Sequence, residues 1–359
     1  MVPTPPATPA SLFLDAAFCR RTPRRPVWMM RQAGRYLPEY QKIRARYDFL
    51  TLCKTPAAAA EVSMQPYDIL GVDAVIVFSD ILLPCEAMGM ELVFTDKHGP
   101  QFPCPIRTRA HFNAIKIPDV PATLGFVGAA IAATRHRLQN RVPLLGFAGA
   151  PWTLACYMIE GGASKNYTSI KSIMYNEPEI LEALLQKTTD TIIHYLNLQV
   201  AAGAQALQLF DTFGGILSPP DWQRFSLPYI QQIFRALRQQ AGVPLILYVR
   251  GSSALLDSMM HSGAHVLSID WMTDLARAHT LAKGRMAIQG NLDPVALFAQ
   301  PEAIRQATLQ MLKTYADTPG YIANLGHGIL PDVPVAHAKT FIDTVQHAPL
   351  ATLTAPVRA

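Results

Sequence analysis

Short apolar runs alternate along this chain with longer amphipathic stretches that stop at glycine. Seven runs have the length of strands, and the stretches between them have the length of helices. This alternation is typical of parallel βα units, whose strands are apolar throughout because helices cover both faces of the sheet. The predicted strands are residues 74–78, 143–148, 206–210, 244–249, 265–269, 286–289 and 321–325.

Helix boundaries are marked by caps and glycines. Residues 56–70 are predicted as a helix that starts with Thr55 as its cap and Pro56 at its first position, and that stops at Gly71. Four more helices are expected to end before glycines 203, 242, 263 and 284. They are predicted at residues 177–202, 219–241, 253–262 and 273–283.

Polar residues follow every predicted strand, and this decides between a closed barrel and an open sheet. An open sheet collects its ligand groups at one switch point, whereas a barrel brings all strand ends to a single mouth. No GxGxxG follows the first strand, which disfavours a dinucleotide fold. The residues at the strand ends are Asp80, Pro151 with Trp152, Asp211 with Thr212, Arg250, Asp270, Asn291 with Asp293, and Asn324 with His327.

We therefore predict an α/β protein with one domain, a distorted (β/α)8 TIM barrel over residues 11–347. The eighth strand is not evident, and residues 27–30 are one candidate for it. Residues 91–105, rich in proline and glycine, are predicted to form an inserted hairpin. The proline-rich residues 1–10 are expected to be a disordered tail, and residues 348–359 a flexible one.

Composition narrows the class of protein. The chain has 359 residues, half of them apolar and 16% charged, which suffices for a large core. A net charge of +5 comes without basic-aromatic repeats or lysine-rich tails, so no nucleic-acid partner is expected. Five cysteines without a CxxC pair indicate reduced thiols and a cytoplasmic location. Residues 142–159 are uncharged, but prolines and glycines interrupt them, so we expect no membrane segment.

Positive charge is concentrated near the N-terminus. From residue 20 to residue 46 there are eight arginines and one lysine against a single acid, a local charge of +8 in a chain of +5. Arg31 and Arg35 follow the apolar run Trp28 to Met30, which should draw them toward the protein body, where they can clamp an anion. The arginines at 20, 21, 24 and 25, split by prolines, are expected to form a solvated loop.

Other candidate residues stand at strand ends. Asp80 follows a buried strand, where a carboxylate either binds a cation or N–H donors or caps a loop. Tyr157 lies in a glycine-rich segment, residues 146–167, that resembles a phosphate cradle only weakly, and it is either a core residue or an inward hydroxyl. Thr212 precedes two glycines, and His327 stands between two others. No histidine has a cysteine two residues later, so no metal site is predicted.

Several of these segments resemble the uroporphyrinogen decarboxylase family. PVWMMRQAGRYLPEY and GFAGAPWTLACYMIEG are similar to its two signatures, and FSDIL, FDTFGG, QGNLDP and NLGHGI to its other blocks in the same order. The resemblance runs from about residue 26 to residue 337. It implies a cytoplasmic homodimer with a distorted (β/α)8 barrel. It also implies removal of the four acetate carboxyls of uroporphyrinogen III, to give coproporphyrinogen III, without metal or organic cofactor.

The resemblance also implies roles for individual residues. Arg31 and Asp80 are the implied catalytic residues, with Asp80 holding the pyrrole nitrogens, and the proton donor stays open between Arg31 and a water. Arg44 aligns with a further family arginine, and Arg250 stands where many members have lysine; the roles of both are open. The implied substrate-binding residues are Arg31, Gln32, Ala33, Gly34, Arg35, Asp80, Tyr157, Thr212 and His327.

The basic window agrees with a substrate that carries eight carboxylates, and a pyrrole can act as its own electron sink. Two alternatives remain open at this point. A corrinoid-linked methyltransferase of the same fold would need a zinc–thiolate site. A non-catalytic tetrapyrrole carrier would bind the product without turnover.

Overall fold

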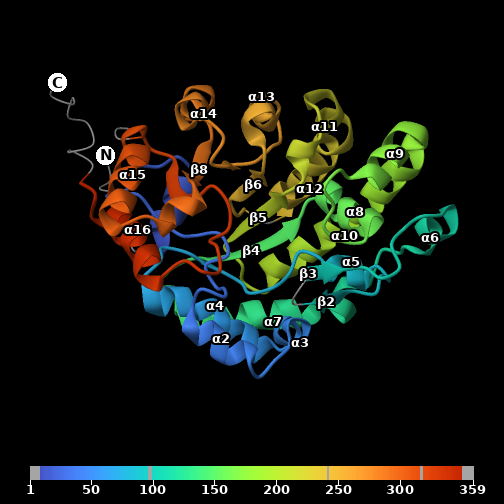
Figure 1. Ribbon diagram of the computed structural model, residues 1–359, viewed down its shortest axis with the longest axis horizontal. Helices are drawn as coiled ribbons and strands as arrows, with labels where there is room; N and C mark the ends of the chain where they lie inside the picture. Colours follow the sequence, from blue (N-terminus) through green and yellow to red (C-terminus); the bar gives the residue numbers. More distant parts are fainter. Residues whose placement is uncertain (1–8, 96–98, 241, 316–317, 350–359) are drawn as a thin grey trace.

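A curled parallel sheet forms the centre of the molecule, with helices around its outside (Figure 1). The computed structural model describes residues 9–95, 99–240, 242–315 and 318–349. All seven predicted strands are confirmed within it, in the order β1-β4-β5-β6-β7-β8-β9. Their bounds are β1 Val75–Ile76, β4 Leu144–Gly149, β5 Ala206–Asp211, β6 Leu245–Val249, β7 Val266–Ile269, β8 Ala287–Leu292 and β9 Tyr321–Leu325.

Each strand pairs in parallel with the next one, so all their carboxyl ends lie on one edge. Every residue of β4, β5, β6, β7 and β9 is buried. Burial on both faces explains why these strands are apolar throughout rather than alternating.

Residues 26–30 occupy the seam between β9 and β1, which confirms the place expected for the missing strand. On one side Val27 forms a parallel bridge with Ala323, and the Trp28 N–H donates to the Ala323 carbonyl at 3.3 Å. On the other side the Asp73 N–H donates to the Val27 carbonyl at 2.8 Å, just ahead of β1. The Val27 N–H in turn donates to the Asp73 carboxylate at 2.9 Å. A side chain replaces a ladder bond here, so the barrel is distorted at this seam.

The helices lie between the strands, and most of the predicted ones are present. The helix at residues 56–70 is confirmed with both ends, and Gly71 ends it with φ 73°. The described helices are α1 Pro9–Ala17, α2 Pro38–Arg44, α3 Phe49–Lys54, α4 Pro56–Leu70, α5 Leu83–Ala87, α6 Arg109–Ala114, α7 Val120–Leu138, α8 Pro151–Glu160, α9 Thr168–Asn176, α10 Pro178–Ala201, α11 Pro219–Phe225, α12 Leu227–Gln240, α13 Leu256–Met259, α14 Leu275–Ala282, α15 Pro301–Lys313 and α16 Val335–His347.

Two helix predictions needed correction. The single helix expected at 219–241 is two helices, α11 and α12, which are separated at Ser226. Pro228 explains the break, because proline removes a backbone donor and disfavours a helical residue before it. The helix expected at 253–262 is a 3-10 turn, Ser252–Ala254, followed by the short α13.

The inserted hairpin at 91–105 is confirmed. It consists of β2 Val93–Thr95 and β3 Gly99–Gln101, which pair antiparallel. The glycine-rich segment 146–167 begins within β4 and contains α8, with only Ala150 between the two.

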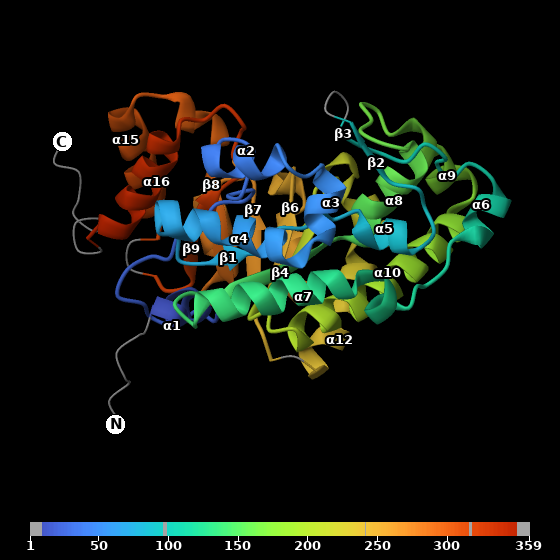
Figure 2. The ribbon, with the colours of Figure 1, turned by 90° about the horizontal axis from the view of Figure 1, so that it is seen from below.

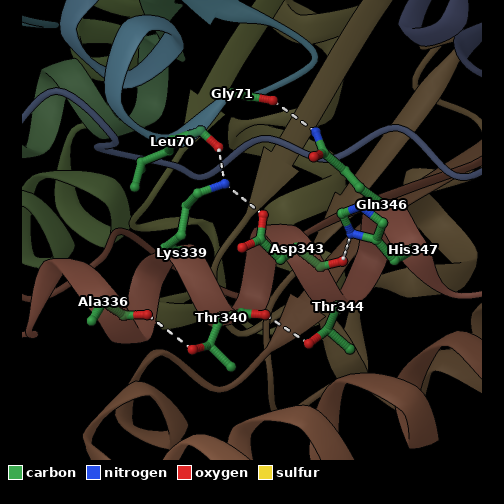
Figure 3. A network of polar contacts seen from close by, with 9 residues as sticks. All are labelled: Leu70, Gly71, Ala336, Lys339, Thr340, Asp343, Thr344, Gln346 and His347. Carbon is green, nitrogen blue, oxygen red and sulfur yellow. Dashed lines mark hydrogen bonds and ion pairs between the residues drawn. The ribbon is translucent and has the colours of Figure 1, made fainter.

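The last helix, α16, closes the outer ring of helices against α4. In Figures 1 and 2 α16 lies beside the end of α4, and Figure 3 shows the contacts in detail. Lys339 donates to the Leu70 carbonyl at 3.4 Å, and Gln346 donates to the Gly71 carbonyl at 2.7 Å. These side chains satisfy carbonyls that have no partner within α4, and the cationic Lys339 is favourable at this negative helix end.

The expected tails fall mostly on residues outside the described ranges. Within those ranges α1 begins at Pro9, two residues ahead of the boundary expected for the barrel, and α16 ends at His347.

Candidate active site

The mouth of the barrel is the edge where the parallel strands end. Asp80 follows β1, Thr212 follows β5 and His327 follows β9, while Tyr157 lies on α8, directly after β4. Arg31 follows the seam segment 26–30. Because all these strands point the same way, the five predicted residues are carried to one end of the barrel.

Arg31 stands at the mouth in an unusual backbone conformation. Its φ is 62°, in the left-handed region that non-glycine residues seldom adopt. Buried Trp28, Met29 and Met30 precede it, as expected, but its own side chain is exposed rather than drawn into the body. None of the ion pairs among the described residues includes Arg31 or the exposed Arg35. Two guanidinium groups are thus available for an anionic ligand.

Asp80 is a partly buried carboxylate near Arg31. Its Oδ1 accepts the Leu82 N–H at 2.8 Å, which fixes the side chain in the turn after β1. Burial raises its pKa to about 6, although the Leu82 bond and the charge of Arg31 both lower it. Desolvation is the larger effect. At neutral pH the carboxylate is still ionised.

Tyr157 and Thr212 both adjoin Phe213, the first through its ring and the second along the chain. The Tyr157 ring packs on Phe213 with ring centroids 5.0 Å apart, and burial together with the charge of Asp80 raises its pKa to about 12. Its hydroxyl therefore stays protonated. Thr212 is partly buried between the end of β5 and Phe213.

His327 is held closely between two other parts of the mouth. A Cβ atom at Gly328 would stand 2.3 Å from Cδ of Arg31, and one at Gly326 would stand 2.3 Å from the backbone nitrogen of Trp271. The glycines on either side of His327 are therefore needed for close approach. Its Nδ1 lies 2.9 Å from the Tyr248 hydroxyl. Burial, Arg31 and Arg250 lower its pKa to about 3, so the ring is neutral.

Comparison with known proteins shows the family of this chain. The model of the family "Uroporphyrinogen decarboxylase (URO-D)" matches residues 8–348. Uroporphyrinogen decarboxylases of Geotalea uraniireducens and Syntrophotalea carbinolica are each 49% identical to this chain over 333 residues. These matches cover 93% of the chain and 97% and 96% of those proteins.

The chain belongs to the uroporphyrinogen decarboxylase family. Its members are carboxy-lyases, as the sequence motifs implied. A methyltransferase from Methanosarcina mazei shares the fold with a TM-score of 0.80, covering 94% of this chain and 98% of that one, at 19% identity. That likeness concerns the fold alone, so the methyltransferase alternative has weaker support than the decarboxylase.

Several polar residues of this decarboxylase family member hold the scaffold instead of lining the mouth. Gln32, predicted to bind substrate, is buried, and its amide bonds the Met29 N–H at 3.1 Å and the Ala74 carbonyl at 3.0 Å. It thereby ties the seam segment to β1. Ala33 and Gly34 follow it and are partly buried. A Cβ at Gly34 would stand 2.9 Å from the Arg31 carbonyl, so this glycine permits the turn that presents Arg31.

Asp211 is also structural. It is fully buried and accepts hydrogen bonds from Thr153 (2.8 Å), Trp222 (2.9 Å) and Ser226 (2.7 Å), which join α8, α11 and the turn before α12. Asp270, likewise buried, accepts the Gly251 N–H at 2.7 Å.

The arginines of the basic segment, residues 20–46, have different surroundings: some hold the scaffold, and others, such as Arg31 and Arg35, are exposed. Arg24 forms a bidentate pair with Asp73, with both distances 2.6 Å, and Arg25 is buried and donates to the Tyr315 carbonyl. The solvated loop expected here is therefore wrong for these two arginines, which fasten the chain at the seam. Arg44 donates to the Tyr47 carbonyl at 2.6 Å and lies over the Phe49 ring.

Three residues of the mouth were not assigned a role from the sequence. Tyr248 is buried in β6, and its hydroxyl crosses the barrel to the loop after β9. Trp271 lies beside His327, with ring centroids 6.3 Å apart, and Arg250 lies over the Trp271 ring at 5.8 Å. A hydroxyl within the apolar run PLILYV was the one sequence signal that pointed to Tyr248.

An outer groove lies away from this site. Its volume is about 600 Å³, and it runs between α2, α4 and α7, with Lys42, Arg46 and Glu61 among its lining residues. Among the described residues no helix is long and apolar enough to cross a membrane, and no group of three or more histidine, cysteine or acidic side chains could hold a metal ion.

Proposed function

We propose that this mouth removes the four acetate carboxyl groups of uroporphyrinogen III and releases coproporphyrinogen III and CO2. The observation that carries the proposal is the exposed, unpaired Arg31 beside the Asp80 carboxylate in a member of this family. A guanidinium recognises an acid side arm, and a carboxylate recognises a pyrrole N–H. A polycarboxylated pyrrole presents both groups together.

Loss of CO2 leaves an electron pair that needs an acceptor, which many decarboxylases obtain from an organic cofactor. Here the substrate supplies it. Protonation of a pyrrole ring carbon gives a cation; the bond between the acetate methylene and its carboxyl carbon then breaks, and its electrons neutralise the ring. A second proton converts the resulting exocyclic methylene to a methyl group, and the first proton then leaves the ring carbon to restore the pyrrole. We therefore propose a reaction without cofactor or metal.

Asp80 is the group that stabilises the cationic ring. Its partly buried carboxylate accepts pyrrole N–H bonds and offers a negative charge where positive charge develops, in surroundings of reduced dielectric. Substrate N–H donors would lower the pKa of this carboxyl below the value of about 6 in the free protein, because they favour the charged form.

The other residues hold the macrocycle and its acid arms. Arg31 and Arg35 bind carboxylates, and Arg31 also orients the acetate that reacts. The turn of Gln32, Ala33 and Gly34 presents these arginines. Tyr157 and Thr212 offer hydroxyls, and His327 offers a neutral ring nitrogen.

A homodimer is part of the same proposal. Apolar side chains stand exposed on the rim after β7 and β8, where Met272, Val295 and Phe298 have exposed fractions of 56, 58 and 45%. A second copy that covers this rim would bury apolar surface otherwise left in water. Light scattering on purified protein should give twice the 39.4 kDa mass of the chain. The free thiols of its five cysteines suit a reducing compartment, so we place the reaction in the cytoplasm.

The deciding experiment incubates purified protein with uroporphyrinogen III under anaerobic conditions and measures both CO2 and products with fewer carboxyls. We expect coproporphyrinogen and four equivalents of CO2. Asp80→Asn, which keeps the size of the side chain, should fold normally and lose most turnover. A folded wild-type protein that binds the macrocycle without releasing CO2 would instead be a carrier.

A further inference from the structure

The Tyr248 hydroxyl lies between two polar partners that belong to the loop after β9. It is 3.0 Å from the Gly326 carbonyl and 2.9 Å from Nδ1 of His327. Tyr248 itself belongs to β6, with β7 and β8 between it and β9 in the sheet. Its side chain therefore reaches across the inside of the barrel to hold the loop that carries His327.

The two contacts together determine which nitrogen of His327 carries the proton. A carbonyl oxygen can only accept, and a tyrosine hydroxyl has a single hydrogen to donate. If that hydrogen goes to Gly326, the hydroxyl oxygen must accept from His327, so Nδ1 is protonated. The opposite tautomer would leave the buried Gly326 carbonyl facing the hydroxyl oxygen with no hydrogen between them.

The charged form of the ring is disfavoured by its neighbours. Arg31 lies against Gly328 on one side, and Arg250 lies over Trp271 on the other. Both guanidinium charges and burial lower the pKa of His327 to about 3. The rings of Tyr248 and His327 are stacked at an angle of 13°, which further restrains the imidazole. The ring is thus neutral, with its hydrogen on Nδ1.

We propose that Tyr248 is a positioning residue that fixes His327 as the Nδ1–H tautomer, so that the Nε2 lone pair accepts an N–H of the bound tetrapyrrole. The part that concerns the ligand rests on the proposed function. A lone pair repels a carboxylate, so His327 does not bind the acid arms. The arginines bind the acids, and His327, like Asp80, binds pyrrole nitrogen.

The protonation state can be measured without substrate. Full-length protein with ¹⁵N-labelled histidine distinguishes protonated from unprotonated ring nitrogens by their NMR shifts, and His327→Gln identifies the signals of this residue. In the wild type at neutral pH we expect a protonated Nδ1 and an unprotonated Nε2. A protonated Nε2 in the wild type would overturn the proposal by itself, whatever the variants do.

Tyr248→Phe removes only the hydroxyl. We expect the fixed pattern to be lost, with protonation appearing at Nε2, and kcat/KM for uroporphyrinogen to fall about tenfold, as when one hydrogen bond to the transition state is lost. Tyr321→Phe is the matched control, because the buried Tyr321 also donates its hydroxyl to a carbonyl, that of Gly290, at 2.5 Å. It should leave the His327 signals unchanged.

A Tyr248→Phe protein with the wild-type pattern and rate would refute the positioning role. If the NMR pattern is found as expected in a wild-type protein that releases no CO2, decarboxylation is refuted, while the control of the tautomer by Tyr248 stands.

Discussion

At the scale of the residue, Arg31 has the most unusual backbone conformation among the predicted site residues. Its left-handed backbone, with φ 62°, costs a non-glycine residue roughly 1–3 kcal/mol, and such conformations gather at functional sites. Arg35, four residues later, has no such conformation. The contrast suggests that the side chain at position 31 is retained for its chemistry at some cost in stability.

We expect Arg31→Gly to be at least as stable as the wild type, because glycine adopts a positive φ freely, and yet to lose most activity. Arg35→Gly should lose about 0.5–1 kcal/mol, since it only adds freedom to the unfolded chain. Urea unfolding measures the stability of both variants. A decarboxylation assay on the same protein preparations, without urea, measures their activity. A clear loss of stability in Arg31→Gly would show that the arginine supports the fold.

The pKa of Asp80 predicts how activity depends on pH. If the ionised carboxylate is required, kcat/KM should rise with pH through about 6, the pKa in the free protein. Arg31→Gln removes the positive charge that lowers this pKa. The acidic limb of the pH profile, over which kcat/KM rises, should therefore move to higher pH. Arg35 does not act on Asp80, so Arg35→Gln should weaken binding and leave the limb in place. Equal shifts in both variants would contradict this assignment.

At the scale of the element, hydrogen bonds from side chains hold the seam segment 26–30 between β9 and β1. Asn324 of β9 accepts the Met30 N–H at 3.0 Å and the Leu325 N–H at 2.8 Å. Gln32 and Asp73 make similar bonds toward β1. These amide and carboxylate groups substitute for a regular strand ladder, and they place Arg31 at the mouth.

Asn324→Ala should therefore destabilise the protein by about 2–4 kcal/mol, since it leaves two buried N–H groups without acceptors. The control is Asn176→Ala at an exposed helix end, which should change stability by less than about 0.5 kcal/mol. Midpoints of urea unfolding give both values. Near-equal losses would mean that the seam does not depend on this amide.

At the scale of the whole molecule, the partly buried His265 makes the stability sensitive to acid. His265 accepts the Leu245 N–H through Nδ1 at 3.0 Å, and its ring meets Phe18 edge-on at 5.3 Å, so it joins β6, β7 and the end of α1. Burial and Arg238 lower its pKa from 6.5 to about 4. As pH falls below 6.5 the unfolded chain takes up this proton first, so stability falls between pH 6.5 and 4.

Asp80 acts in the opposite direction, because its pKa is raised and the folded state takes up the proton first as pH falls from about 6 toward 3.8. The contribution of His265 is therefore measured by comparing the acid-induced loss of Tm in a His265 variant with that in the wild type. His265→Asn, whose carbonyl can accept the same N–H, should lose less Tm between pH 7 and pH 5 than the wild type does. An identical loss of Tm in both proteins would rule out His265 as a source of acid sensitivity.

The periodicity of the chain sufficed for the strands, the helix α4 with both ends and the hairpin at 91–105, since each depends on local features such as apolar runs, glycine stops and proline. The candidate residues could also be located at strand ends, because parallel strands share one edge. The family motifs then identified the chemistry.

Tertiary structure alone decided which polar residues face the mouth and which fasten the barrel. Asp80 and Asp211 both follow apolar strands, yet Asp211 has three side-chain donors around it and Asp80 has one backbone N–H beside Arg31. The same holds for Arg25, which is buried, and Arg31, which is exposed. Partners distant in sequence determine desolvation, hydrogen bonding and pKa, and a local pattern carries no information about them.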